Sequence, residues 1–272
     1  MKLTDEQLRE YRERGFLVFN DLFSAEEVDI LRRQLSSMAN EEGVMREKGD
    51  GPLRIVFRTH DANSPTHRPA FEALSKDPRI LEPSQQLLKD NDLYVWHSKC
   101  NLKEAIDGEV WQWHQDFGAW GKDGVKSPEG MVTVLCMLNE ATEIGGCLYF
   151  IPGSHKEGLI EPQRDEKTTS YGIWKIPTKD MVALVEKYGE PVPIVGKPGT
   201  VAFFHPYILH GSGHNMSTHS RWQTYMVYNQ VANKPNPKEE PRPAYVVGRD
   251  YTPLPMGNEG DIVASAKSRE TA

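Results

Sequence analysis

Hydrophobic and polar residues alternate with one spacing in the first third of the chain and with another spacing beyond it. Up to about residue 90, apolar residues mostly recur every three or four positions, as Val28, Leu31 and Leu35 do. That spacing is typical of helices with one buried face. From Leu93 onward, apolar residues form short runs between turns that contain glycine and proline. The pattern predicts N-terminal helices followed by a series of strands.

Two local signals mark the starts of the first helices. Thr4 is followed three residues later by Gln7, and Ser24 by Glu27. In such a capping box the hydroxyl accepts a hydrogen bond from the first turn, while the longer side chain reaches back to the cap. The first helix is expected to end at Gly15, because glycine readily adopts the left-handed conformation that closes many helices.

The same two spacings of apolar residues predict the remaining helices and strands. We expect strands at 16–19, 53–57, 93–101, 110–116, 131–138, 147–151, 200–204, 207–210 and 222–231, helical segments at 70–88 (broken at Asp77-Pro78) and 178–188, a loop at 40–52, and a C-terminal segment rich in proline and charge that wraps the surface. The run at 131–138 is apolar at nearly every position, as in a central strand buried on both faces. Short strands in series with flanking helices predict a mainly β fold, a cupin-like jelly roll (double-stranded β-helix) with its helices packed on one side.

The chain has the length and composition of one folded unit. Its 272 residues are 38% hydrophobic, enough to bury a sizeable core. The sequence contains no Ser/Gly-rich linker, internal repeat or low-complexity tract, so we expect a single domain over residues 1–272. The polar segment 156–195 is expected to form a lid or a substrate-selecting insert, because long polar excursions in compact domains tend to be functional.

Charge and cysteine content restrict the partners and the compartment. The net charge is −7 with acidic and basic residues interspersed, which argues against nucleic acid and anionic membranes as partners. No apolar run approaches about 18 residues, and residues 1–6 lack the apolar core of a signal peptide. Cys100, Cys136 and Cys147 lie in apolar, strand-like contexts without a CxxC pair, so buried thiols are expected. We expect a soluble, cytoplasmic protein; the sequence leaves its oligomeric state open.

The residues with the clearest chemistry are two histidines and an aspartate. His114 and Asp116 are separated by one residue, so on a strand both side chains leave the same face. His210 follows the aspartate after 94 residues. Two imidazoles and one carboxylate form the ligand set of non-haem iron(II) oxygenases, which keeps positions open for a bidentate co-substrate and dioxygen. A His-x-Asp tripeptide alone is frequent by chance, so the prediction depends on the distal histidine and on the arginine after it.

That arginine suggests the co-substrate. Arg221 comes eleven residues after the distal histidine and offers a rigid fork that matches a carboxylate of 2-oxoglutarate, although a surface ion pair is the commoner fate of an arginine. Ser212 could add a hydroxyl to the same carboxylate, and Asn101 could donate its amide to the other end of the co-substrate. His97 shares a strand face with Asn101. It either contacts the co-substrate or is a buried histidine bonded to a backbone carbonyl.

Other residues near the motif carry weaker predictions. Trp113 and Trp120 flank the metal motif, and one or both could form a wall of the pocket, although tryptophan is more often a core residue. His205, His214 and His219 also lie close in sequence to the distal ligand. Gly211-Ser212 and the interval to the arginine favour His210 over these three.

The metal motif and its surroundings resemble the phytanoyl-CoA dioxygenase family of iron(II)/2-oxoglutarate oxygenases. The resemblance rests on the following residues: His114, Asp116, His210 and Arg221, with Pro152-Gly153-Ser154-His155 between them. The segments 113–120 and 204–212 are similar to the branch that contains ectoine hydroxylase and free L-amino-acid hydroxylases such as leucine 5-hydroxylase. The C-terminal segment 231–254 is similar to the leucine hydroxylase in particular. The resemblance extends from about Leu3 to Leu254.

This resemblance implies a jelly-roll dioxygenase that uses iron(II), 2-oxoglutarate and dioxygen. It implies hydroxylation of an unactivated C–H bond of a free L-amino acid or a similar small molecule, with release of succinate and carbon dioxide. Halogenating relatives carry a small residue at the position of Asp116, so the aspartate argues for hydroxylation. In ectoine hydroxylase a glutamine and an asparagine assist 2-oxoglutarate. Asn101 fits the asparagine, whereas His97 replaces the glutamine.

The substrate and its anchor are less well defined by the sequence. Arg249 is the first candidate to bind a substrate carboxylate, followed by Arg58 and Arg242, and the resemblance adds Phe117 as a residue near the substrate. Two alternatives to amino-acid hydroxylation are open. One is a hydroxylase of ectoine or of a specialised metabolite, and the other is a non-catalytic iron-binding protein. An acyl-CoA substrate is not expected, because no basic cluster is evident that would hold the nucleotide phosphates.

Overall fold

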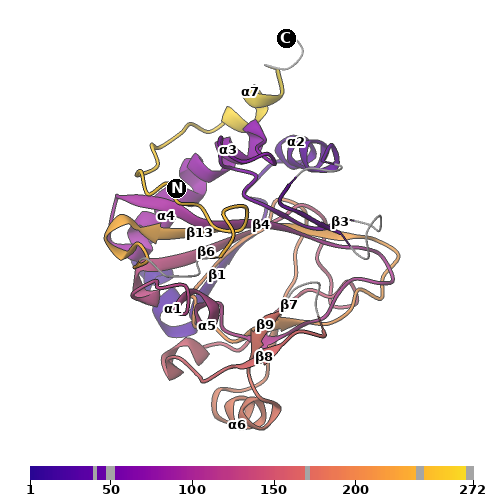
Figure 1. Ribbon diagram of the computed structural model, residues 1–272, viewed down its shortest axis with the longest axis vertical. Coiled ribbons are helices and arrows are strands. Elements are labelled where there is room, and N and C mark those ends of the chain that lie inside the picture. Colours follow the sequence, from indigo (N-terminus) through magenta and orange to yellow (C-terminus); the bar gives the residue numbers. More distant parts are fainter. Residues whose placement is uncertain (39–41, 47–52, 169–171, 237–241, 268–272) are drawn as a thin grey trace.

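Two antiparallel β-sheets lie face to face and form the centre of the molecule (Figure 1). The computed structural model describes residues 1–38, 42–46, 53–168, 172–236 and 242–267. The large sheet has the order β1 (Phe16–Phe19), β11 (Val201–Phe204), β6 (Met131–Met137), β13 (Arg221–Gln230), β4 (Leu93–Lys103), β3 (Leu53–Phe57) and β2 (Val44–Arg46). The small sheet has the order β10 (Val192–Ile194), β7 (Leu148–Phe150), β12 (His210–Ser212), β5 (Trp111–His114), β9 (Ile173–Lys175) and β8 (Gln163–Asp165). The predicted mainly β jelly-roll fold with flanking helices is confirmed.

The predicted central strand lies in the middle of the large sheet. All seven residues of β6 are buried, because β11 and β13 flank the strand and both of its faces are covered. One face packs against helices and the other faces the small sheet. The near-continuous apolar run in the sequence reflects this double coverage.

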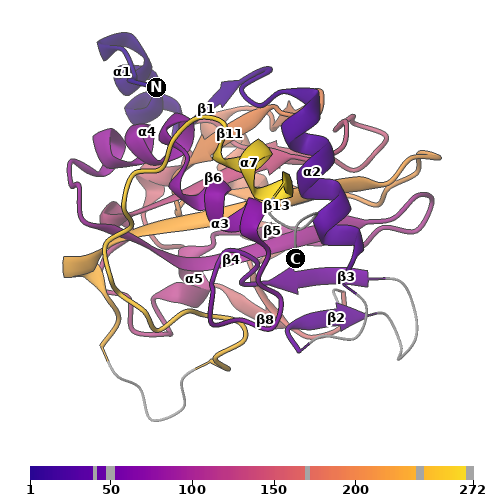
Figure 2. The same cartoon turned by 90° about the horizontal axis from the view of Figure 1, so that it is seen from above.

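Helices cover the outer face of the large sheet (Figure 2). They are α2 (Ala25–Ser36), α3 (Pro69–Lys76), α4 (Pro78–Leu88) and the C-terminal α7 (Asp261–Lys267). The helix α1 (Asp5–Arg14) lies at the margin, beside the edge strand β1, and apolar residues of all five helices share one core cluster with the sheet. The short α5 (Phe117–Trp120) follows β5, and α6 (Thr178–Tyr188) packs below the small sheet (Figure 1). Single 3-10 turns occupy Pro128–Gly130, Ser154–Glu157 and Val231–Asn233. The helices therefore lie mainly, but not only, on one side.

Both predicted capping boxes form. The Thr4 hydroxyl accepts from Gln7 N at 3.2 Å, while Gln7 Oε1 accepts from Thr4 N at 2.8 Å. Ser24 and Glu27 repeat the arrangement at 3.3 and 2.8 Å. The first helix ends at Gly15, whose φ of +84° is the left-handed conformation expected there. These local signals were sufficient because every partner lies within a few residues.

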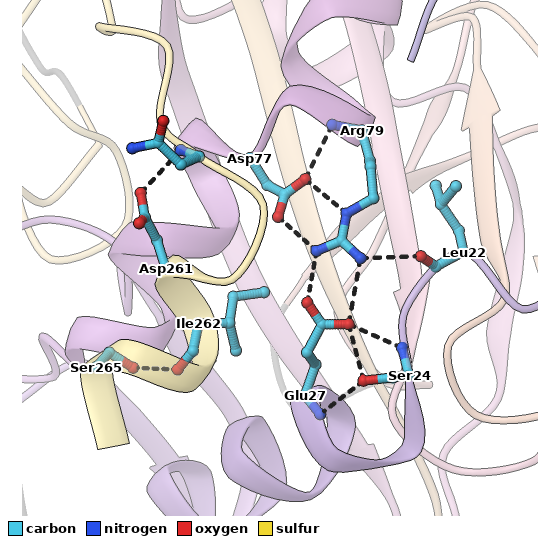
Figure 3. A network of polar contacts seen from close by, with 9 residues as sticks. Leu22, Ser24, Glu27, Asp77, Arg79, Asp261, Ile262 and Ser265 are labelled. Atoms are coloured by element: carbon cyan, nitrogen blue, oxygen red, sulfur yellow. Dashed lines mark hydrogen bonds and ion pairs between the residues drawn. The ribbon is translucent and has the colours of Figure 1, made fainter. Parts of the chain in front are cut away.

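A buried ionic network ties α2 to α4 (Figure 3). Arg79 bonds Glu27 of α2 at 2.5 Å and Asp77, the cap of its own helix, at 2.7 Å. The same guanidinium donates to the backbone oxygen of Leu22 at 3.2 Å and lies over the ring of Phe23. The side chains of Glu27 and Asp77 are only 7% and 1% exposed, so the arginine supplies the opposite charge that two buried carboxylates need.

Four local predictions differ from the structure. The predicted loop at 40–52 contains the short strand β2, with residues 39–41 and 47–52 outside the described part. The strand at 110–116 ends at His114, and 207–210 is a turn that becomes a strand only at His210. The C-terminal segment wraps the surface as predicted but ends in α7, which forms because Ile262 is buried against the other helices.

The predictions about cysteines and membrane spans can also be compared with the fold. Cys100, Cys136 and Cys147 are all buried free thiols, as expected. Among the described residues, no helix combines the length and the apolar character needed to cross a bilayer.

Candidate functional site

Two histidines and an aspartate meet where the small sheet faces the large one. His114 ends β5 and His210 begins β12, and the two residues are register partners on these neighbouring strands. Their imidazole rings lie 4.1 Å apart between centroids. Asp116 Oδ1 lies 3.7 Å from His114 Nε2 and 3.9 Å from His210 Nε2. The three side chains offer ligand atoms within 4.8 Å of one another, so they could hold a metal ion.

Backbone carbonyls fix the orientation of both rings. His114 Nδ1 lies 2.6 Å from Gln112 O, and His210 Nδ1 lies 3.0 Å from Ile208 O. Each Nδ1 therefore carries the proton and donates it, which leaves Nε2 with its lone pair toward the aspartate. Burial lowers the pKa of both imidazoles, and for His114 the neighbouring His210 lowers the pKa further. A neutral imidazole whose Nε2 lone pair is free to coordinate is the form of histidine that binds metal.

Asp116 reaches this position by a turn, which corrects the argument from strand alternation. The strand stops at His114, and Asp116 has helical dihedral angles, φ −57° and ψ −39°, at the start of α5. Gln115 holds the turn: its amide donates to Gly158 O and Tyr207 O, both at 2.8 Å, and accepts from Ile160 N at 2.9 Å. Gln115 is therefore a supporting residue that the sequence analysis missed. Its three partners lie more than 40 residues away, so no local signal pointed to it.

An inner cavity adjoins the triad on the side of the large sheet. Its lining includes, besides the three triad residues, Lys99, Asn101, Trp111, Leu148, Ser212, Arg221 and Tyr225. The predicted residues Asn101, Ser212 and Arg221 are thus brought together with the triad. Tyr225 was not predicted, although it lies on the strand that Arg221 begins and at the alternating position that faces inward.

Arg221 is a buried cation that no carboxylate in the described part of the chain neutralises. Its side chain is 1% exposed and donates to Gln223 Oε1, which also accepts from the Tyr225 hydroxyl at 2.8 Å. No carboxylate of a described residue forms an ion pair with it, and its Nε has no hydrogen-bond partner within the described part of the chain. A buried charge of this kind is costly unless an opposite charge joins it. The cavity therefore fits an anionic group such as a carboxylate.

A β-bulge determines which residues of β4 face the cavities. Val227 pairs with His97, but the next residue, Tyr228, pairs with Val95, so Trp96 is an extra residue in β4. Such a bulge reverses the alternation of faces. Before it, Val95 points toward the helices. After it, the inward residues are His97, Lys99, Asn101 and Lys103.

A larger outer cavity of about 380 Å³ opens on the other side of the triad. Its aromatic walls are Phe57, Trp111, Trp120, Trp174, Tyr225 and Tyr245, and its charged residues besides Asp116 are Lys99, Lys122, Asp123, Arg164 and Arg242. Arg242 Nη2 and Asp123 Oδ2 form an ion pair at 2.6 Å within this lining. The cavity combines apolar walls with a few charges of both signs, as small-molecule sites commonly do.

Comparison with known proteins identifies the family. Residues 11–222 match the model of the phytanoyl-CoA dioxygenase (PhyH) family. The chain belongs to the phytanoyl-CoA dioxygenase family. Ectoine dioxygenase from Bordetella bronchiseptica is 31% identical over 265 residues, which cover 91% of this chain and 83% of the relative. L-proline trans-4-hydroxylase from Streptomyces griseoviridis is 30% identical, with 93% and 95% covered.

Solved structures agree with this membership. The crystal structure of EctD from S. alaskensis with 2-oxoglutarate and 5-hydroxyectoine has a TM-score of 0.78 and 26% sequence identity, and the match covers 94% of this chain and 88% of that one. The structure of the same protein with bound iron gives the same values. The chain is thus an enzyme of the dioxygenase family that the sequence motifs indicated.

Several predicted site residues of this family member lie elsewhere than expected. His97 lines the outer cavity, not the inner one, and its Nδ1 lies 2.9 Å from Val246 O, as in the alternative of a histidine bonded to the backbone. Trp120 lines the outer cavity, as expected for a wall residue. Trp113 does not, because it directly precedes His114 on β5 and its side chain packs on the opposite face, in the cluster that includes residues of α6. Phe117 packs edge-on against Tyr207 and lines neither cavity.

The order of the three candidate arginines also changes. Arg249, the first candidate, is exposed, and Arg58 is held by Asp61 and by the Ala244 carbonyl. Neither lines the inner or the outer cavity as the described residues form them. Arg242, ranked behind them, does. The reason is tertiary, since the C-terminal segment passes the cavity mouth at 242–246 and then leaves it.

The segment 156–195 forms part of the small sheet. Its strands β8 and β9 form one edge of the small sheet, and β10 forms the other. Arg164, Ile173 and Trp174 from β8 and β9 line the outer cavity. The segment therefore contributes a wall of that cavity, which is consistent with a role in substrate selection, while a lid movement stays a prediction.

Proposed function

We propose that the protein is an iron(II)- and 2-oxoglutarate-dependent dioxygenase that hydroxylates an unactivated C–H bond of a free L-amino acid. The overall reaction takes substrate, dioxygen and 2-oxoglutarate to hydroxylated substrate, succinate and carbon dioxide. The observation that carries the proposal is the adjacency of the His114–Asp116–His210 triad to the unneutralised, buried Arg221.

Each group of residues has a distinct part in this proposal. His114, Asp116 and His210 hold the iron, and the carbonyl-bonded Nδ1 atoms keep both imidazoles correctly oriented. Arg221 binds the distal carboxylate of 2-oxoglutarate with help from Ser212. When bound, iron and 2-oxoglutarate supply the oxidising chemistry, while the protein supplies binding and orientation.

The outer cavity supports a zwitterionic substrate. Arg242 and Asp123 place a cation and an anion side by side in its lining, which suits the carboxylate and the ammonium group of an amino acid. Trp120, Trp174 and Tyr245 provide apolar walls for the side chain and exclude water from the reacting carbon. A volume of about 380 Å³ suits a molecule of this size.

Hydroxylation of ectoine is a second candidate function, and the same features of the outer cavity support it. Ectoine also carries a carboxylate and a cationic group, and ectoine dioxygenases are among the relatives. A non-catalytic iron-binding role has no comparable support, because the proposed ligand residues and the proposed carboxylate anchor are all present together. The buried, free cysteines fit the reducing environment of the cytoplasm.

A product screen tests the proposal. Purified protein receives iron(II), 2-oxoglutarate and ascorbate with single L-amino acids or ectoine, and mass spectrometry detects the gain of one oxygen while succinate is quantified. We expect an oxygenated amino acid with the native protein and none with Asp116→Ala. Oxygen gain on ectoine alone would favour the second candidate. Iron-loaded protein that forms neither product nor succinate contradicts the enzymatic proposal.

Two matched variants test whether Arg242 binds the carboxylate of the substrate. Arg242→Met removes the cation of the outer cavity, whereas Arg249→Met removes an exposed arginine of the same segment. We expect the first to raise the KM for the amino acid about tenfold or more, the value of a charge-assisted hydrogen bond, and the second to leave it nearly unchanged. The reverse order would restore Arg249 as the anchor.

A further inference from the structure

Trp111 is a buried tryptophan at the boundary between the two cavities, and the reaction described above gives it no part beyond that of a wall. Its indole lines both the inner and the outer cavity. Besides His114 and Asp116, only Lys99 and Tyr225 among the described residues share that position. Lys99 Nζ lies 4.6 Å from the centroid of the indole and 5.5 Å from that of the Tyr225 ring. The three side chains therefore form one partition between the cavities.

A β-bulge turns this indole toward the metal site. On β12, Ser212 follows His210 after one intervening residue, and these two residues pair with Trp111 and His114 on β5. The partners on β5 are three positions apart, so β5 contains one extra residue. On a regular strand, side chains three positions apart leave opposite faces, and the bulge brings both to the inner face. The strand that supplies a metal ligand therefore also supplies its aromatic neighbour.

Trp111 is also in ring contact with the triad. The centroid of its ring lies 6.5 Å from that of His114, and the two ring planes are tilted by 34°. Phe150 and Phe204 contact the ring of His210, but they line neither cavity. Among the phenylalanine, tyrosine and tryptophan residues that the structure describes, Trp111 alone both contacts a triad ring and faces the cavities.

An indole in this position is open to the oxidising chemistry that iron and 2-oxoglutarate supply. Indole is the most electron-rich of the aromatic side chains, which is also why it binds cations best. An amino acid in the outer cavity covers the indole and offers its own C–H bond, and a filled, closed site suppresses side reactions of this kind. Without an amino acid, the indole is the oxidisable group next to the triad. Trp111 is only 7% exposed, so an oxidant from solution has little access to it.

We propose that Trp111 is an oxidation site of the protein itself: in the absence of an amino acid, turnover of 2-oxoglutarate places one oxygen atom on its indole ring. This inference rests on the proposed function. Dioxygen, 2-oxoglutarate and the indole give succinate, carbon dioxide and a hydroxyindole. One oxygen atom enters succinate, and the other forms a C–O bond in place of a ring C–H bond, with the hydroxyl proton balancing the displaced hydrogen. Dioxygen accepts four electrons, two from 2-oxoglutarate and two from the indole.

The added hydroxyl group changes a wall that both cavities share. A buried hydroxyl needs a hydrogen-bond partner, and the apolar side chains in the same cluster as the indole, Ile55, Phe57 and Ile173, offer none. Protein kept with iron and 2-oxoglutarate alone should therefore lose activity with time. An amino acid in the outer cavity protects the enzyme, because it takes the oxygen atom in place of the indole.

Peptide mass spectrometry tests the proposal. Protein with iron(II) and isotopically labelled dioxygen is kept with 2-oxoglutarate, without an amino acid and without ascorbate, and is then digested. We expect the peptide that contains Trp111 to gain one labelled oxygen atom, and fragmentation to place it on the indole. With succinate in place of 2-oxoglutarate, we expect no gain. Trp111→Phe should lose the modification, because a phenyl ring is harder to oxidise, whereas Trp174→Phe, at another tryptophan of the outer cavity, should keep it.

Met216 serves as an internal control against oxidants that diffuse through solution. This residue is 67% exposed, and methionine is readily converted to its sulfoxide. Free peroxide or radicals should therefore oxidise Met216 before the buried indole. Label on Met216 instead of Trp111, or equal label with succinate, contradicts the proposal. Label on Tyr225 in place of Trp111 contradicts it as well.

The outcomes separate this inference from the proposed function. Protein that hydroxylates an amino acid in the product screen but gains no oxygen at Trp111 refutes only the inference. Protein that gains no oxygen there and forms no succinate with any amino acid or with ectoine refutes the proposed function too. The measurement is made on the native protein, so it stays decisive even if Trp111→Phe does not fold.

Discussion

His114 and His210 are register partners on adjacent antiparallel strands, although 96 residues separate them in the sequence. The pairing brings two imidazoles side by side, and the turn after β5 adds the carboxylate of Asp116. The pairing of β5 and β12 therefore fixes the relative position of the two histidines. This relationship leads to the first of five predictions.

Asp116→Ala should remove iron binding and activity together. The substitution deletes the one anionic ligand, and we expect the iron affinity to fall by a factor on the order of 100 or more, at least as much as for the loss of a supporting hydrogen bond. Iron titration and succinate formation measure the two effects. His219→Ala, at a histidine outside the triad, serves as the control and should retain both. An Asp116→Ala protein with native iron affinity would mean that other ligands hold the metal.

Arg221→Met should raise the KM for 2-oxoglutarate roughly 100-fold with a smaller effect on kcat. The guanidinium can donate two hydrogen bonds to a carboxylate, and each bond to a charged group contributes about 1.5–3 kcal/mol. Arg221→Lys keeps the charge but not the fork, so an intermediate KM is expected. Steady-state rates at varied 2-oxoglutarate check the order. Unchanged KM values would place the carboxylate anchor elsewhere.

Arg79→Met should destabilise the protein by about 3 kcal/mol, because it leaves two buried carboxylates without their partner. The free energy of unfolding from urea titrations at pH 7 measures the effect. The matched control is Arg32→Met, which removes an exposed ion pair with Asp29 and should have little effect on stability. Equal losses in the two variants would show that the network of Figure 3 contributes no more than a surface pair.

The same network predicts how stability depends on acid. Burial opposes ionisation of Glu27, but hydrogen bonds from Arg79 and Ser24 outweigh it and hold its pKa below the usual value. The carboxylate therefore contributes stability that is complete above the unfolded pKa of about 4.3 and is lost as the pH falls through the lower, folded pKa. The difference between the native protein and Arg79→Met should shrink below pH 4. Urea midpoints at pH 7, 5, 4 and 3 test this expectation.

Native thiols should be inert toward an aromatic disulfide reagent. Burial raises the pKa of Cys100 and Cys136 to about 12 and also raises that of Cys147, and all three residues are at most 2% exposed. Little thiolate exists, and the reagent has no access to it. We expect no reaction in the folded state and three reacting thiols in guanidinium. Rapid reaction of one thiol in the native state would reveal local opening of the sheets.

The sequence by itself determined the elements whose signals are local. The caps at Thr4 and Ser24 and the end of the first helix at Gly15 appear where predicted, since their partners lie within one element or one turn. The buried strand β6 also appears where predicted, because its continuous apolar run is itself a local signal. The ligand triad was also predicted, because its chemistry is restricted to few residue types in a fixed order.

Only the tertiary structure decided which other residues reach the cavities. The bulge at Trp96 sets which residues of β4 face inward from His97 onward, and the path of the C-terminal segment selects Arg242 over Arg249. Burial turns Lys103, an ordinary lysine in the sequence, into a partner of Ser212. The position of each of these side chains depends on strand register and on contacts between segments that are distant along the chain. Register and contacts are set by how all elements pack together. No stretch of neighbouring residues encodes that packing.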